Sequence, residues 1–134
     1  MTKQMKYDEF LKLEASRAQK RKRKPRHIEE SIQVACVKWF RLQYPNLVIF
    51  AVPNGGSRNL YEAKNMKESG TLAGVADLVI VGNGGRVLFV EMKSGRNKQE
   101  DNQILFQKNV ERLGHKYVIC RSIEGFKKEV DLWV

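Results

Sequence analysis

The chain has 134 residues, enough for one compact domain with a buried core and too few for two. Its formal net charge of +10 favours an anionic partner, either nucleic acid or an acidic membrane surface. No apolar run approaches the roughly 20 residues that span a bilayer, and the N-terminus lacks the apolar segment of a secretory signal. We therefore expect a cytoplasmic protein without membrane segments, in which Cys36 and Cys120 are buried free thiols.

The first 26 residues differ from the rest in charge. Residues 1–27 hold ten Lys or Arg against three acids, whereas the remainder carries a net charge of +3. Residues 7–13 have helix-compatible apolar spacing, and residues 17–26 form a dense basic run that resists burial. We predict an accessory helix or arm over residues 1–26. Whether it is a solvated tail or an arm that contacts phosphates stays open at this point.

The remaining residues alternate between helical and strand patterns. Apolar residues recur every three or four positions over 28–43, which predicts an amphipathic helix, and residues 47–52 predict a short buried strand. A short helix is expected over 60–69. Apolar runs at 77–81 and 86–93, joined by the glycine-rich turn 82–85, predict an antiparallel hairpin.

A polar loop follows over 94–100. We then expect a helix over 103–113, a strand over 117–120 and a helix over 123–134. The strand runs are dense enough to be buried on both faces and they alternate with helices. This order predicts an α/β sandwich with a mixed central β-sheet flanked by helices.

Three polar residues at the ends of the predicted hairpin strands form the strongest functional pattern. Asp77 begins one strand, and Glu91 and Lys93 lie two residues apart at the end of the next, so they project to the same side. Two carboxylates can bind a hard divalent cation together with a substrate phosphate. A lysine can orient the attacking water or offset the negative charge of the transition state. This chemistry hydrolyses phosphodiesters. The plainer alternative is that Asp77 caps a turn and Glu91 pairs with Lys93 on an edge strand.

The start of the first long helix carries further polar candidates. Glu29 and Gln33 are four residues apart and share a helix face, which could point toward the sheet. Helix capping by Glu29 and Glu30 is the simpler explanation of the spacing alone.

Two other segments could contact a bound phosphate. Gln103 begins the second amphipathic helix directly after the loop that follows Lys93, although Gln99 and Gln107 compete with it for this role. Residues 53–58 form a turn whose backbone amides, together with Arg58, could contact a phosphate, or form a plain loop.

Taken together and in order, these elements resemble the VRR-NUC family, the virus-type replication-repair nucleases of the PD-(D/E)XK superfamily. The resemblance covers residues 27–132 and implies a nuclease domain over 27–134 with a restriction-endonuclease-like fold. The segments that carry it are Glu29 with Gln33, Pro53-Asn54-Gly55-Gly56-Ser57-Arg58, Gly74-Val75-Ala76-Asp77-Leu78, Glu91-Met92-Lys93, Gln103, and Tyr117-Val118-Ile119-Cys120-Arg121-Ser122.

The resemblance implies a Mg²⁺- or Mn²⁺-dependent endonuclease. Asp77 and Glu91 would be the metal ligands, Lys93 would assist the attacking water, and Glu29 and Gln103 would support the site. The family usually has proline immediately before the metal-binding aspartate, whereas this chain has Ala76, so the fixed φ angle of proline is missing there.

Stand-alone members of phage or bacterial origin are similar to Holliday-junction resolvases and tend to be homodimers. The resemblance therefore implies a structure-selective enzyme acting on branched or junction DNA in a bacterial or phage-infected cytoplasm. The alternative is a non-catalytic DNA-binding accessory protein of replication or packaging that uses the basic arm. The residues expected to contact DNA are Arg21, Lys22, Arg23, Lys24, Arg26, Asn54 and Arg58.

Overall fold

The computed structural model describes residues 6–20, 25–53 and 60–134. Its helices are α1 (Tyr7–Lys20), α2 (Pro25–Gln43), α3 (Leu60–Glu68), α4 (Asp101–Arg112) and α5 (Ile123–Trp133). Its strands are β1 (Val48–Ala51), β2 (Leu78–Val81), β3 (Val87–Met92) and β4 (Lys116–Cys120). Within these residues no helix is both long enough and apolar enough to cross a membrane.

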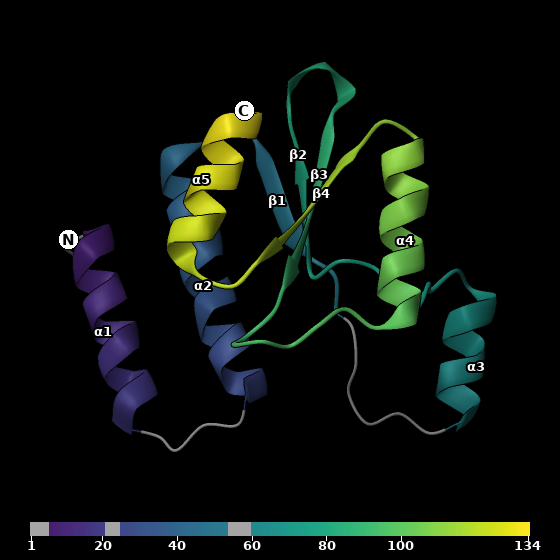
Figure 1. Ribbon diagram of the computed structural model, residues 1–134, viewed down its shortest axis with the longest axis horizontal. Coiled ribbons are helices and arrows are strands. Elements are labelled where there is room, and N and C mark those ends of the chain that lie inside the picture. The colour runs from purple at the N-terminus through teal and green to yellow at the C-terminus, as the bar shows by residue number, and fades with distance from the viewer. Residues whose placement is uncertain (1–5, 21–24, 54–59) are drawn as a thin grey trace.

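The four strands form one mixed sheet in the order β1-β2-β3-β4. β1 pairs antiparallel with β2 and β2 with β3, whereas β3 and β4 are parallel. Helices α2 and α5 cover one face of the sheet, and α4 covers the other over β4 (Figure 1). The predicted α/β fold with a mixed central sheet and flanking helices is confirmed, as is the antiparallel hairpin. Gly84 and Gly85 in its turn have the positive φ angles that such a turn requires.

Each face of the sheet has its own apolar core. The larger core lies under α2 and α5 and includes Phe40, Leu78, Leu88 and Phe126, all with no exposed surface. The smaller core lies under α4, between Phe106, Val110, Tyr117 and the fully buried Ala76. Cys36 and Cys120 are free thiols buried in the larger core, as predicted.

The prediction that β1 is a buried strand is wrong. Only Ile49 of this strand is buried, while Val48 and Phe50 are 55% and 45% exposed. The reason is that β1 is the edge of the sheet and has α2 against one face only. The apolar composition of residues 47–52 therefore identified a strand correctly but not the number of faces that are covered.

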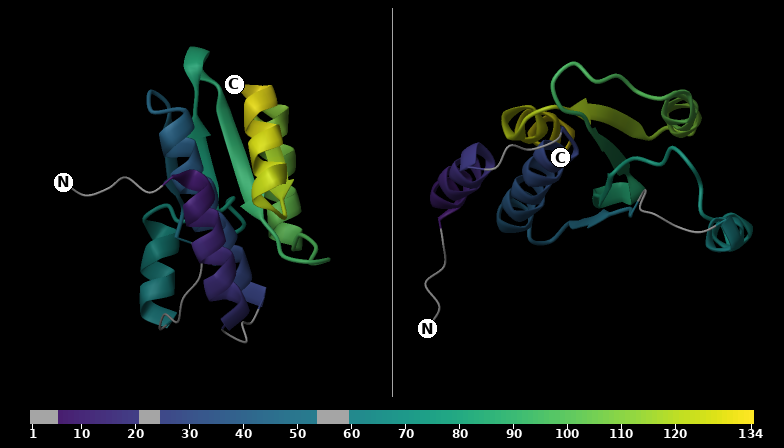
Figure 2. Two further views of the ribbon diagram at one scale, coloured as in Figure 1. Left: turned by 90° about the vertical axis from the view of Figure 1, so that its left-hand side faces the viewer. Right: turned by 90° about the horizontal axis from the view of Figure 1, so that it is seen from below.

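Helix α1 packs against α2, on the side of α2 away from the sheet (Figure 2). Phe10 is 8% exposed, and the Nζ atom of Lys38 on α2 lies 4.2 Å from the centre of its ring. Part of the segment predicted as an arm therefore contributes to the core, while the domain boundary at residues 26 and 27 stays a prediction.

Helix α2 begins at Pro25, three residues before the predicted start, because proline fits the first position of a helix.

Candidate active site

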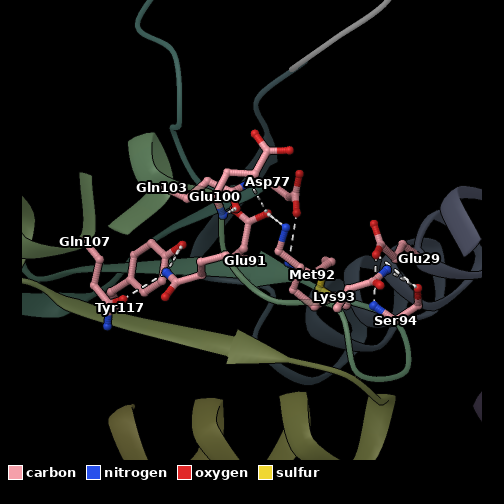
Figure 3. Close-up of polar contacts among 12 residues, drawn as sticks. Glu29, Asp77, Glu91, Met92, Lys93, Ser94, Glu100, Gln103, Gln107 and Tyr117 are labelled. Carbon is pink, nitrogen blue, oxygen red and sulfur yellow. Dashed lines mark hydrogen bonds and ion pairs between the residues drawn. The ribbon is translucent and has the colours of Figure 1, made fainter. Parts of the chain in front are cut away.

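Pairing of β2 with β3 brings Asp77 and Glu91 to the same end of the sheet. Leu78 pairs with Val90, so Asp77, one residue before β2, lies opposite Glu91. The Asp77 Oδ2 atom accepts a hydrogen bond of 2.8 Å from the backbone N–H of Met92. This bond fixes the Asp77 carboxylate beside the end of β3 (Figure 3).

Glu91 is a charged residue in an almost fully buried position. Its side chain belongs to β3 and the residue is 3% exposed. Its Oε1 atom accepts a 3.2 Å hydrogen bond from Nε2 of Gln103 and lies 4.0 Å from Nζ of Lys93. Its Oε2 atom is buried and has no hydrogen-bond partner among the described residues. One carboxyl oxygen of Glu91 is therefore held by Gln103, and the other is buried without a described hydrogen-bond donor to offset the loss of its contact with water.

The surroundings of Glu91 favour its protonated form. Burial raises the pKa of the Glu91 carboxyl to about 9 from its ordinary value of 4.5, and the negative charge of the Asp77 carboxylate adds to the rise. The Lys93 ammonium acts in the opposite direction, and its side chain is itself only 12% exposed. A carboxylate pair of this kind is costly to ionise unless a cation is bound between the two groups.

Glu29 reaches the loop that follows β3. Its Oε1 atom accepts hydrogen bonds from the backbone N–H of Ser94, at 2.9 Å, and from the Ser94 hydroxyl, at 3.1 Å. Glu30 instead lies 3.9 Å from His27 with its side chain 62% exposed. Of the two acids, Glu29 is therefore the one with hydrogen bonds to Ser94, on the far side of Lys93 from Asp77 (Figure 3).

The three competing glutamines have separate partners. Gln103 lies in the first turn of α4, where its Oε1 atom accepts a 2.8 Å bond from the backbone N–H of Glu100 in a capping box. The capping box also explains why α4 begins two residues before the predicted start. Gln99 bonds to Gln107 and to the hydroxyl of Tyr117. Of these glutamines, Gln103 is the one with a hydrogen bond to Glu91.

Close packing against α4 holds the segment that leads to Asp77. Gly74 has a φ angle of +86°, and a Cβ atom there would lie 2.4 Å from the backbone oxygen of Asn102, next to Gln103. Ala76, in the position where the family usually has proline, is fully buried against Phe106 and its neighbours. Packing against α4 therefore holds the backbone of residues 74–76 in place, although this chain lacks the proline that would restrict the φ angle at residue 76.

These side chains line a cleft of about 1070 Å³ between the end of the sheet, the N-terminal part of α2, and α3. Gln33 also lines it, on the same helix as Glu29. Among the described residues, the acidic ones that line it are Glu29, Glu30, Asp77, Glu91 and Glu100, and the basic ones are Lys67 and Lys93.

The residues expected to contact DNA fall largely outside the described part of the chain. Residues 21–24 and both Asn54 and Arg58 lie outside it, and Arg26 is described only as part of the α2 backbone. Among the described residues, no group of three or more His, Cys, Asp or Glu side chains could hold a metal ion. The side chains at the site that could hold a divalent cation are Asp77 and Glu91, and two carboxylates with oxygens from water or substrate are a common ligand set for Mg²⁺.

Two residues that contact the site were not predicted from the sequence. Ser94 was included only in a polar loop, yet it is 6% exposed and bonded to Glu29. Gly74 was noted only as part of a motif. For Gly74 the sequence offered a sign of its role, because a glycine shortly before a candidate functional aspartate indicates a turn. For Ser94 it offered none beyond its position directly after Lys93.

The chain is therefore an α/β protein in which two neighbouring carboxyl groups, Asp77 and Glu91, and Lys93 lie at one end of strands β2 and β3. Comparison with known families gives a match to the VRR-NUC domain over residues 14–124, and the chain belongs to this family. VRR-NUC is a family of nuclease domains, so the chain is assigned a nuclease function. The match begins inside α1, earlier than the predicted start at residue 27.

Two solved structures support the fold. One, described as a VRR_NUC domain protein, has 20% identity over 80% of this chain and 88% of its own, with a TM-score of 0.64. Another, described as a VRR_NUC domain, has 16% identity over 80% of this chain and 98% of its own, with a TM-score of 0.57. No curated protein matches the chain in a sequence comparison.

Proposed function

We propose that the chain is a metal-dependent DNA endonuclease that hydrolyses phosphodiester bonds in the cleft beside Asp77, Glu91 and Lys93. One observation carries the proposal: the buried Oε2 atom of Glu91 has no partner among the described residues and lies beside a second carboxylate. A carboxylate oxygen without compensation in such a place fits a hard divalent cation, which takes oxygen ligands.

Asp77 and Glu91 would hold Mg²⁺ or Mn²⁺. When bound, such an ion neutralises charge on the phosphoryl and leaving oxygens. The protein prepares each carboxylate for this role. The Met92 N–H holds Oδ2 of Asp77, and Gln103 holds Oε1 of Glu91, so both groups are oriented before any substrate arrives.

Lys93 supplies a positive charge beside this pair. Its Nζ atom, 4.0 Å from Glu91 Oε1, can donate a hydrogen bond to the attacking water or to a phosphoryl oxygen. Because Lys93 is mostly shielded from solvent, its charge is screened less than that of a surface lysine. Glu29 holds the backbone on the other side of Lys93 through Ser94.

We further propose that the substrate is branched DNA, including four-way junctions, and that the protein acts as a homodimer. Symmetric cleavage of two strands calls for two sites related by a two-fold axis. What supports this part is the resemblance to stand-alone VRR-NUC nucleases.

Cleavage assays test the proposal directly. A set of junction, flap, nicked and linear DNAs should be cut by the wild-type protein in Mg²⁺ or Mn²⁺ and left intact in EDTA. Asp77→Asn and Glu91→Gln should lower the cleavage rate by about 1000-fold or more, since metal chemistry contributes several kcal/mol. Glu111→Gln on the outer surface of α4 is the matched control and should cut normally. Unchanged cutting in EDTA and by Asp77→Asn would show that the metal mechanism is wrong.

The same assay distinguishes the nuclease from a non-catalytic DNA-binding accessory protein. An accessory protein would bind DNA without cleaving it under any combination of metal and pH, and Asp77→Asn and Glu91→Gln would bind DNA as the wild type does. Sedimentation of the protein alone and with junction DNA tests the homodimer.

A further inference from the structure

We propose that the loop between β3 and α4 binds backbone phosphates of the nucleic acid beside the cleft, through Arg96 and Lys98. We call residues 95–98 the basic loop. The proposal rests on the nuclease function proposed above and names the surface that would hold the DNA next to the candidate site.

The charge of the cleft is the first argument. Five acidic residues and two lysines are among the described residues that line it, so carboxylates outnumber lysines there even when Glu91 is protonated, and these side chains together repel a polyanion. A DNA strand bound there needs positive charge at the rim. The basic loop begins two residues after Lys93, contains Arg96 and Lys98 with no acidic residue, and exposes both side chains.

The beginning of the basic loop is held in place by hydrogen bonds. Ser94 is bonded to Glu29, and the Asn97 backbone N–H and side-chain amide donate to the Ser94 carbonyl and hydroxyl at 3.1 and 3.3 Å. A guanidinium nitrogen of Arg121, just after β4, donates to the Gly95 carbonyl at 2.9 Å. Gly95 itself has a φ angle of +53°, which allows the chain to turn there.

The end of the basic loop is held as well. Gln99 donates to the side-chain oxygen of Gln107 at 2.9 Å and to the hydroxyl of Tyr117 at 3.2 Å. The two exposed cations, Arg96 and Lys98, therefore lie between fixed points. A backbone that is already ordered loses little entropy when these side chains bind phosphates.

The position of the loop fits this role. It runs from the end of β3, beside the N-terminal part of α2, to the start of α4 (Figure 1). In the left view of Figure 2 it projects from the body of the protein. Because Glu29 of α2 bonds to Ser94, the loop is also adjacent to the end of α2 that follows the basic run 17–26. The basic loop and the N-terminal end of α2 thus lie at the same end of the molecule (Figure 1).

Salt-dependent binding tests the proposal. A fluorescein-labelled four-way junction and a linear duplex of equal length are titrated with the full chain in EDTA, between 50 and 200 mM salt. Each phosphate contact contributes about 0.9 to the slope of log K against log salt, so Arg96→Gln with Lys98→Gln should lower the slope by about 2. Near 0.1 M salt this corresponds to a loss of affinity on the order of 100-fold.

The matched control removes the same charge from another surface. Lys108→Gln with Arg112→Gln changes two exposed cations toward the far end of α4 and should leave the slope within about 0.5 of the wild type. With Mg²⁺, the loop variant should raise KM and keep kcat within about threefold, since neither side chain belongs to the proposed catalytic group.

The outcomes are distinguishable. An unchanged slope in the loop variant, or an equal fall in the control variant, overturns the role of the basic loop even if the wild type cuts DNA. A specific fall in the loop variant, together with no cleavage by the wild type in any metal, supports the loop and overturns the nuclease proposal.

Discussion

Replacing Glu91 by glutamine should flatten the pH dependence of the stability of the metal-free protein. Burial, followed by the Asp77 carboxylate, raises the Glu91 pKa to about 9 in the folded protein, from an ordinary value of 4.5. Between these two values the folded state keeps a proton that the unfolded state has released. The free energy of unfolding of the wild type therefore falls as pH rises through this window, by about 1.4 kcal/mol per pH unit for one proton.

Between pH 6 and pH 8 the fall due to Glu91 amounts to roughly 3 kcal/mol. Glutamine has nearly the same shape and no charge, so the stability of Glu91→Gln relative to the wild type should rise by this amount over the same interval. Urea unfolding followed by circular dichroism, in EDTA at pH 6, 7 and 8, measures the difference. Glu111→Gln, an exposed acid on α4, should follow the wild type. Parallel pH dependences for Glu91→Gln and the wild type would refute the reasoning, because Glu91 would then be ionised in the folded protein.

Three further substitutions test the supporting structure by urea unfolding. Gly74→Ala should lower stability by at least about 2 kcal/mol, because of its positive φ and the 2.4 Å approach to Asn102; a change below about 0.5 kcal/mol would contradict the close packing. Phe10→Ala should cost about 3 kcal/mol and Leu13→Ala, at a position that is 37% exposed, much less, whereas equal costs would mean that α1 does not pack as described. Ser94→Ala should cost about 1.5–3 kcal/mol by removing a hydrogen bond to a carboxylate, with Ser94→Thr retaining most of the stability, and an unchanged Ser94→Ala would argue against that bond.

The buried position of Phe10 also affects how the basic arm should be studied. Deleting residues 1–24 would remove α1 and expose apolar surface on α2, so a loss of DNA binding could reflect lost stability. Neutralising the charges of residues 17–24 in the full chain separates the two effects. Weaker binding with a lower salt slope and an unchanged melting temperature would support an arm that contacts phosphates.

The sequence by itself determined the order of the helices and strands, the antiparallel hairpin and the group of Asp77, Glu91 and Lys93. These features depend on short-range rules. Strand alternation places Glu91 and Lys93 on one side, and the glycines of the turn specify the hairpin, which in turn brings Asp77 opposite Glu91. The family followed from the same residues, because their order along the chain is itself the pattern.

Only the tertiary structure decided which faces are covered and which of several equivalent polar residues contact the site. Phe50 is apolar but exposed, because β1 is an edge strand and α4 covers the other end of the sheet. Glu29 rather than Glu30 meets Ser94, and Gln103 rather than Gln99 meets Glu91, because helices α2 and α4 are docked on opposite faces of the sheet and turned to particular angles. Those angles depend on packing between residues far apart in the sequence, which local periodicity does not encode.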